Sequence, residues 1–65
     1  MTGKELKKFF EENGWVCDRI KGSHHIMIKN AKRSVPIPIH SNKDLPKSLV
    51  KTIIKQGEIK PYNKK

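Results

Sequence analysis

The spacing of apolar residues predicts that the chain opens with a helix. Three apolar residues recur at helical spacing in this segment: Leu6, Phe9 and Phe10. Thr2 and Glu5 are placed as in a capping box, and Gly14 suits a left-handed helix end. We therefore expect a helix over residues 3–13.

The middle of the chain alternates between apolar and polar residues, which is typical of strands. We expect strands over residues 15–20, 24–29 and 33–39, the first two joined as a hairpin through a short glycine-containing turn. Pro36 and Pro38 lack the backbone donor that a sheet ladder needs. The third strand therefore belongs at an edge of the sheet.

The same alternation assigns the faces of these strands. We expect Ile26 and Ile28 to face the core, and His25 to point to the open side of the sheet. In the first strand, unbroken alternation would separate Val16, Asp18 and Ile20 from Trp15, Cys17 and Arg19. Trp15 would then pack against the first helix, and Cys17 would fill space within the sheet.

A second helical pattern begins near Asp44-Leu45-Pro46 and stops at Gly57. Asp44 or a neighbour can cap this helix, and Pro46 suits its first turn. The order helix, three strands, helix predicts an α+β fold: a three-stranded antiparallel sheet with both helices on one face, as in a double-stranded-RNA-binding domain. The expected core comprises Ile26, Ile28, Val35, Ile37 and Ile39 of the sheet with Leu6, Phe9, Phe10, Leu49 and Ile53 of the helices.

Length and composition predict one domain over residues 1–58, followed by a flexible basic tail over residues 59–65. The single cysteine allows no disulfide within the chain. No apolar run reaches the length of a membrane span, and the N-terminus has no apolar signal core. We therefore expect a cytoplasmic protein without membrane contact.

The net charge of +9 on 65 residues predicts a polyanionic partner, because such a charge repels itself in the compact state. Nucleic acid, an anionic membrane and an acidic protein all qualify. A row of lysines recurs every four residues through the second helix and its entry: Lys43, Lys47, Lys51 and Lys55. This row is either a solvated face or a support for phosphates. The overall charge favours phosphates, with Lys21 and Arg33 as further RNA contacts.

A histidine follows a glycine turn at the start of the second strand. Gly22 lets the backbone turn or approach a ligand closely, and Ser23 and His24 come next. Histidine exchanges protons near neutral pH. RNA carries its own nucleophile, the 2′-hydroxyl, so a base at His24 with nearby cations would cut it without a metal. The competing interpretation is an ordinary surface or hydrogen-bonding histidine.

The other candidate groups point to no cofactor. His40 closes the third strand and is open to three roles: a second proton-transfer group, a phosphate ligand or a loop cap. The three histidines and Cys17 match no zinc spacing, so we expect no metal. Trp15 and Tyr62 are too few to form a stacking platform for single strands.

Four segments together resemble the HicA family of bacterial toxins, over about residues 2–57. They are Thr2-Gly3-Lys4-Glu5-Leu6, Lys21-Gly22-Ser23-His24-His25, Val35-Pro36-Ile37-Pro38-Ile39-His40 and Leu49-Val50-Lys51-Thr52-Ile53-Ile54-Lys55-Gln56. The resemblance implies a double-stranded-RNA-binding-like fold, cleavage of mRNA with growth arrest, and silencing by a HicB antitoxin. It implies that His24 is the catalytic histidine and that Gly22 is the glycine of the same turn.

We therefore interpret the chain as the toxin of a HicA/HicB-type toxin–antitoxin pair, a metal-independent endoribonuclease (mRNA interferase) acting on mRNA. The alternative is a non-catalytic RNA-binding module, which explains the charge and the fold equally well. A DNA-binding domain is less favoured, because the second helix offers lysines and few Asn, Gln or Arg side chains for base edges.

Overall fold

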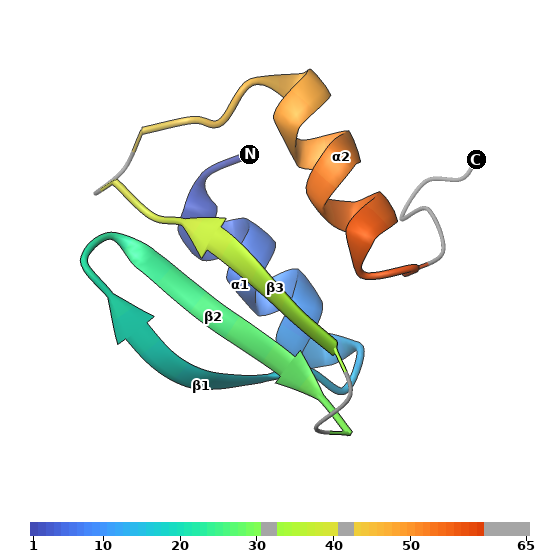
Figure 1. Cartoon of the computed structure of the whole chain (residues 1–65). Coiled ribbons are helices and arrows are strands. Elements are labelled where there is room, and N and C mark those ends of the chain that lie inside the picture. Colours follow the sequence, from blue (N-terminus) through green and yellow to red (C-terminus); the bar gives the residue numbers. More distant parts are fainter. Residues whose placement is uncertain (31–32, 41–42, 60–65) are drawn as a thin grey trace.

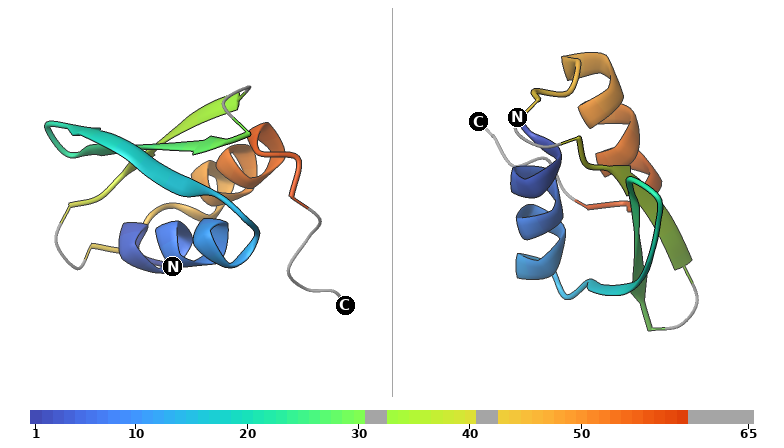
Figure 2. Two further views of the ribbon diagram at one scale, coloured as in Figure 1. Left: turned by 90° about the horizontal axis from the view of Figure 1, so that it is seen from below. Right: turned by 90° about the vertical axis from the view of Figure 1, so that its left-hand side faces the viewer.

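The computed structural model describes residues 1–30, 33–40 and 43–59. Its elements are helix α1 (Gly3–Glu12), strands β1 (Val16–Lys21), β2 (His24–Lys29) and β3 (Arg33–Pro38), and helix α2 (Lys47–Gln56). The strands form one antiparallel sheet in the order β1-β2-β3, and both helices lie on the same side of it (Figures 1 and 2). The expected α+β, double-stranded-RNA-binding-like fold is confirmed. Neither helix in this part of the chain is long and apolar enough to cross a membrane.

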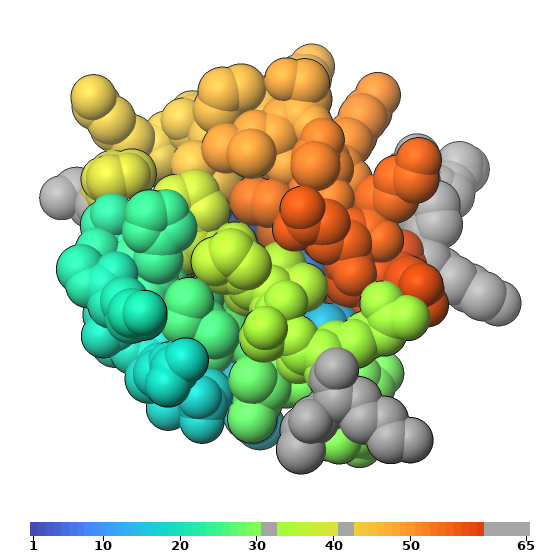
Figure 3. Space-filling model, viewed as in Figure 1, coloured from blue at the N-terminus to red at the C-terminus, as the bar shows by residue number. Residues whose placement is uncertain are grey.

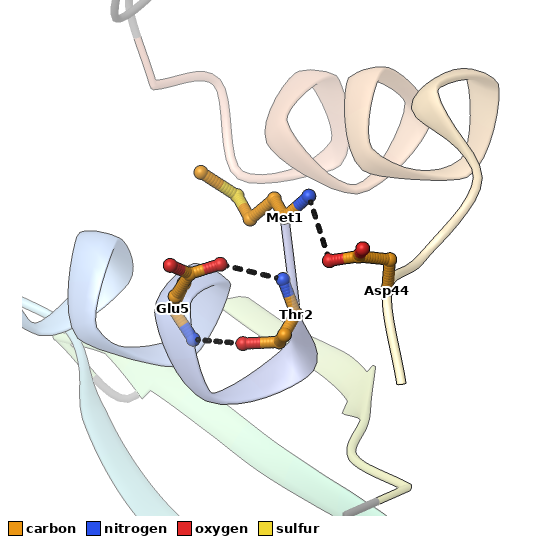
Figure 4. A network of polar contacts seen from close by, with 4 residues as sticks. All are labelled: Met1, Thr2, Glu5 and Asp44. Carbon is orange, nitrogen blue, oxygen red and sulfur yellow. Dashed lines mark hydrogen bonds and ion pairs between the residues drawn. The ribbon is translucent and has the colours of Figure 1, made fainter. Parts of the chain in front are cut away.

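Helix α1 begins at the expected capping box. The Glu5 amide donates to Thr2 Oγ1 at 3.2 Å, and the Thr2 amide donates to Glu5 Oε1 at 2.8 Å (Figure 4). The helix ends before Gly14, whose φ of 91° is costly for residues with a Cβ atom. Both ends of this helix were therefore predictable from its sequence.

The start of α1 lies directly against the end of β3. Gly3 is buried, and a Cβ atom at this position would lie 2.8 Å from Cγ1 of Ile39 and still closer to the carbonyl oxygen of Pro38. Only a glycine therefore allows the helix and the strand end to approach so closely.

The core lies between the sheet and the helices. Phe10 and Trp15 pack edge to face with their ring centroids 5.1 Å apart, so the expected contact of Trp15 with the first helix is confirmed. Leu49, expected in the core, is 37% exposed. The buried residues are Leu6, Phe10, Trp15, Met27, Val35, Ile37, Val50, Ile53 and Ile54, with Phe9, Cys17, Ile39, Leu45 and Ile59 partly buried against them.

The predicted faces of β2 were wrong. Met27 is fully buried on the helix side, opposite Cys17 on β1 and Val35 on β3, whereas Ile26 and Ile28 are only half-buried on the open side. Side chains on a strand alternate, so His25 shares the helix side with Met27 instead of pointing outward. The local apolar pattern favours Ile26 and Ile28, but directly paired residues share a face, and the register places Met27 opposite the buried Val35.

Strand β1 contains a bulge that interrupts its alternation. Cys17 pairs with Met27 and Arg19 pairs with the next residue of β2, Ile26, which leaves Asp18 as an extra residue. The expected unbroken alternation was therefore wrong. Arg19 lies on the face opposite to that of Cys17, although the two residues have the same parity.

The ends of α2 differ in detail from the prediction. Pro46 is the N-cap residue and makes no side-chain cap. Asp44 instead lies 3.4 Å from the N-terminal amine of Met1 (Figure 4), and the Leu45 amide donates to the Met1 carbonyl. These contacts tie the entry of α2 to the start of α1.

Helix α2 ends before Gly57, as expected. Gly57 has an ordinary φ of −80°, and the left-handed residue is Glu58. A Cβ atom on Gly57 would lie 2.9 Å from the buried Phe10 ring, so crowding explains the glycine. Ile59, the first residue of the expected tail, packs against the core, and residues 60–65 lie outside the described part.

We predict that Gly3→Ala lowers the free energy of unfolding by about 1–3 kcal/mol, because the new methyl group must push α1 away from β3. Urea denaturation followed by circular dichroism measures this loss. Lys4→Ala, at an exposed position of the same helical turn, is the matched control and should change stability by less than about 0.5 kcal/mol. Equal stability of the two variants would contradict the close approach.

Candidate functional site

The open face of the sheet consists of three rows of side chains that run across the strands. Because His25 and Met27 face the helices, the alternate residues of β2 and their partners form this open face. In order along β2, the rows are Lys21–His24–Pro38, Arg19–Ile26–Pro36 and Val16–Ile28–Ser34.

His24 occupies the middle of the first row. It is exposed, with Lys21 directly opposite on β1 and Pro38 opposite on β3. Directly paired residues on neighbouring strands have their Cβ atoms about 5 Å apart. The imidazole is thus accessible from solvent and has a cation on the neighbouring strand directly opposite it.

The turn before His24 is held in place by its backbone. Gly22 has a φ of 59°, and no atom lies within 4 Å of where its Cβ would be, so backbone conformation explains this glycine. The carbonyl of the half-buried Ser23 accepts a hydrogen bond of 2.8 Å from the Ile39 amide. The turn is therefore fixed to the end of β3, and His24 is fixed with it.

The bulge adds a second cation that sequence analysis missed. Arg19 lies in the row next to His24 because Asp18 is the extra residue of β1. Its Nε lies 3.9 Å from Asp18 Oδ2, but both side chains are largely exposed, so this pair is weak and Arg19 remains available to an anion. No periodicity in the sequence marks the bulge, and unbroken alternation would have grouped Arg19 with Cys17.

The lysine row follows the exposed side of α2. Lys47, Lys51 and Lys55 are all exposed, and α2 contains no acidic residue to neutralise them. Figure 3 looks onto the open sheet face, and the side chains of α2, in orange, project along its upper margin. A shallow hollow of about 330 Å³ lies beside this row and is lined by Met1, Leu45, Lys47, Val50 and Lys51.

Arg33 lies far along the sheet from His24. It is the first residue of β3 and pairs with Lys29, whereas His24 pairs with Pro38 at the other end of that strand. Its Nη2 atom also lies 2.9 Å from Glu58 Oε2. The structure therefore does not bring Arg33 together with His24, and its predicted contact with RNA stays a prediction.

The other two histidines differ in environment. His40 is exposed, and its carbonyl accepts a hydrogen bond of 3.0 Å from the Lys43 amide; the neighbouring Ser41 and Asn42 lie outside the described residues. His25 lies on the helix side opposite Ile37, and its Nδ1 atom is buried without a hydrogen-bond partner in the described structure. The prediction that His25 reaches the open face was therefore wrong.

Among residues 1–30, 33–40 and 43–59, no group of three or more His, Cys, Asp or Glu residues could hold a metal ion. Cys17 is half-buried against the core, and its Sγ atom contacts the Arg19 carbonyl at 3.6 Å. This position fits the packing role expected for the cysteine.

Comparison with known families gives a match over most of the chain. The model of the family described as the HicA toxin of bacterial toxin–antitoxin matches residues 3–59. The chain belongs to this family. It is thus the toxin of a HicA-type toxin–antitoxin pair, as the four sequence segments implied. A search of curated proteins found no match.

A solved structure supports the HicA assignment. One chain of a toxin–antitoxin complex from Streptococcus pneumoniae is similar to this toxin with a TM-score of 0.77 and 35% sequence identity. The similarity covers 91% of this chain and 98% of the other. Sequence and fold therefore agree over nearly the whole length of both chains.

We predict that His25→Leu raises the free energy of unfolding of this HicA toxin by about 1 kcal/mol, because it removes a buried nitrogen that has no partner. Thermal denaturation by calorimetry measures the gain. The same substitution at the exposed His40 is the control and should leave stability unchanged. A loss of stability in His25→Leu would show that the imidazole makes a contact that leucine cannot replace.

Proposed function

We propose that this HicA toxin is a metal-independent endoribonuclease that cleaves mRNA at His24 and is silenced by a HicB-like antitoxin. The observation that carries the proposal is the pairing register of the open face. It places an exposed imidazole opposite Lys21 and beside the row of Arg19. A base and two cations thus share one accessible surface.

The chemistry uses the nucleophile that RNA already carries. The His24 imidazole accepts the proton of a 2′-hydroxyl, and the 2′-oxygen forms a bond to the adjacent phosphorus. Lys21 and Arg19 stabilise the negative charge that develops on the phosphoryl oxygens. The bond from phosphorus to the 5′-oxygen then breaks, this oxygen takes a proton from water, and the resulting hydroxide takes the proton from His24, which restores the base. The products are a 2′,3′-cyclic phosphate and a 5′-hydroxyl.

The lysine row supplies affinity without base readout. Lys47, Lys51 and Lys55 are exposed on α2, and this helix lies along the upper margin of the open sheet face in Figure 3. Lysine contacts to phosphates position a strand but do not read its sequence. We therefore assign backbone binding to the helix and cleavage to the sheet.

An antitoxin partner is supported by the family and by the similar structure, which is a complex of a toxin with an antitoxin. A HicB-like protein is the partner that the family resemblance implies. The net charge of +9 favours an acidic binding surface on that partner.

We predict that His24→Ala lowers the rate of RNA cleavage by about 100- to 10,000-fold, the usual contribution of a general base. The assay follows a labelled RNA in excess EDTA and analyses the product ends for the cyclic phosphate. His25→Leu, which changes the adjacent histidine on the other face, should cleave at the wild-type rate. Unchanged cleavage by His24→Ala would remove the proposed base. Loss of wild-type cleavage in EDTA would remove the metal-free mechanism.

We also predict that replacing Lys47, Lys51 and Lys55 together by Gln weakens RNA binding and makes the binding constant less dependent on salt concentration. Three lost phosphate contacts should lower the slope of log K against log salt concentration by about 2 for single-stranded RNA. Fluorescence anisotropy in the His24→Ala background measures this slope without cleavage. The control makes the same charge change on α1, at Lys4, Lys7 and Lys8. Equal slopes for the two triple variants would contradict a binding role specific to α2.

A further inference from the structure

The open sheet face is apolar beyond the row of His24. Val16 is 57% exposed, Pro36 is exposed, and Ile26 and Ile28 are only half-buried. These four residues occupy the second and third rows, with Arg19 and Ser34 as their polar neighbours. Both helices pack on the other side, so no element of the described chain covers this patch (Figure 2).

RNA is a poor occupant for this patch. Proteins that bind nucleic acid on a sheet use aromatic side chains for stacking and cations for phosphates. The second and third rows contain no aromatic residue and only one cation, Arg19. Aliphatic side chains that remain in contact with water favour burial against another protein surface.

We propose that these two rows are the docking surface of the antitoxin, an acidic protein that places apolar side chains on Val16, Ile26 and Ile28. Its carboxylates would pair with Arg19 and Lys21 at the side of the patch nearest His24. The inference rests on the proposed antitoxin partner but not on the proposed cleavage chemistry.

The charge of the chain selects an acidic partner over a second copy. Two copies meeting through this face would bring their Arg19 and Lys21 side chains together, and each chain carries a net charge of +9. Like charges at an interface disfavour association, whereas carboxylates of an acidic partner would pair with these cations.

Docking here would also cover the proposed active site. Ile26 is two residues after His24 on β2, a spacing of about 7 Å along the strand. Strands of six residues in a three-stranded sheet present a face of roughly 300 Å². A stable interface needs about 800 Å² from each partner. An antitoxin anchored on the apolar rows must therefore extend over neighbouring surface, and the row of His24 is directly adjacent.

The bulge provides a matched pair of variants on one strand. Val16 and Ile20 are both β-branched residues of β1, with 57% and 58% of their surface exposed. Val16 pairs with Ile28 on the open face, whereas Ile20 pairs with His25 on the helix side. Replacing each by lysine therefore makes nearly the same chemical change on opposite faces of the sheet.

The experiment measures binding to the protein encoded in the neighbouring reading frame, with all toxin variants in the His24→Ala background. We expect Val16→Lys and Ile28→Lys each to weaken binding at least about tenfold in isothermal titration calorimetry, while Ile20→Lys binds as the parent does. RNA affinity, measured by fluorescence anisotropy, should not fall in any of the three. Circular dichroism checks that each variant is folded.

Three results would overturn the docking surface. Binding of Val16→Lys and Ile28→Lys at parental strength would place the antitoxin elsewhere. A loss of RNA affinity in these variants would assign the face to RNA. A dimer of the free parent protein that Val16→Lys dissociates, seen by analytical ultracentrifugation, would assign the face to a second copy. If the neighbouring protein fails to bind the parent at all, the proposed antitoxin partner fails, whereas cleavage by the wild-type toxin is tested independently in EDTA.

Discussion

Two helices of ten residues can cover only one face of a three-stranded sheet, and the pairing register decides which side chains that face receives. In this toxin the helices cover the face of Met27, Val35 and Ile37, each at most 2% exposed. The other face is left exposed to solvent. The site depends on this division, because the register that buries Met27 on the helix side leaves His24, three residues earlier in β2, on the exposed side.

The division of faces also lets this small basic protein form an apolar core and keep its many cations at the surface. The core needs apolar side chains in contact, and this need is met on the helix side without any buried charge among the described residues. The cations stay at the surface, where water screens their repulsion and where an anionic partner can displace that water. Binding of an anionic partner at this surface would therefore reduce the repulsion between the cations without a contact to the buried core.

Much of the fold could be predicted from residues with special backbone needs. The capping box of Thr2 and Glu5, the glycine with positive φ at Gly14, and the prolines of the edge strand each constrain the chain locally, and the expected element bounds lie close to those observed. The faces of β2 were predicted wrongly, since its local pattern favours Ile26 and Ile28, whereas the register with β3 places Met27 beside the buried Val35. The cap of α2 was also missed, because Asp44 pairs with an amine that is distant in sequence. At the site, Gly22 and His24 could be recognised from the local sequence. Arg19 could not, because only the pairing of β1 with β2 places it beside them.

The extra residue in β1 has a consequence for how related sequences are compared. Cys17 and Arg19 keep their partners on β2 on either side of Asp18, and so the two flanks keep their faces whether or not a residue stands between them. A relative one residue shorter at this point would present the same cations through a regular ladder. An alignment without a single-residue gap at this point would match helix-side residues of one protein with open-face residues of the other along half of the strand. Equivalent surfaces would then look unrelated.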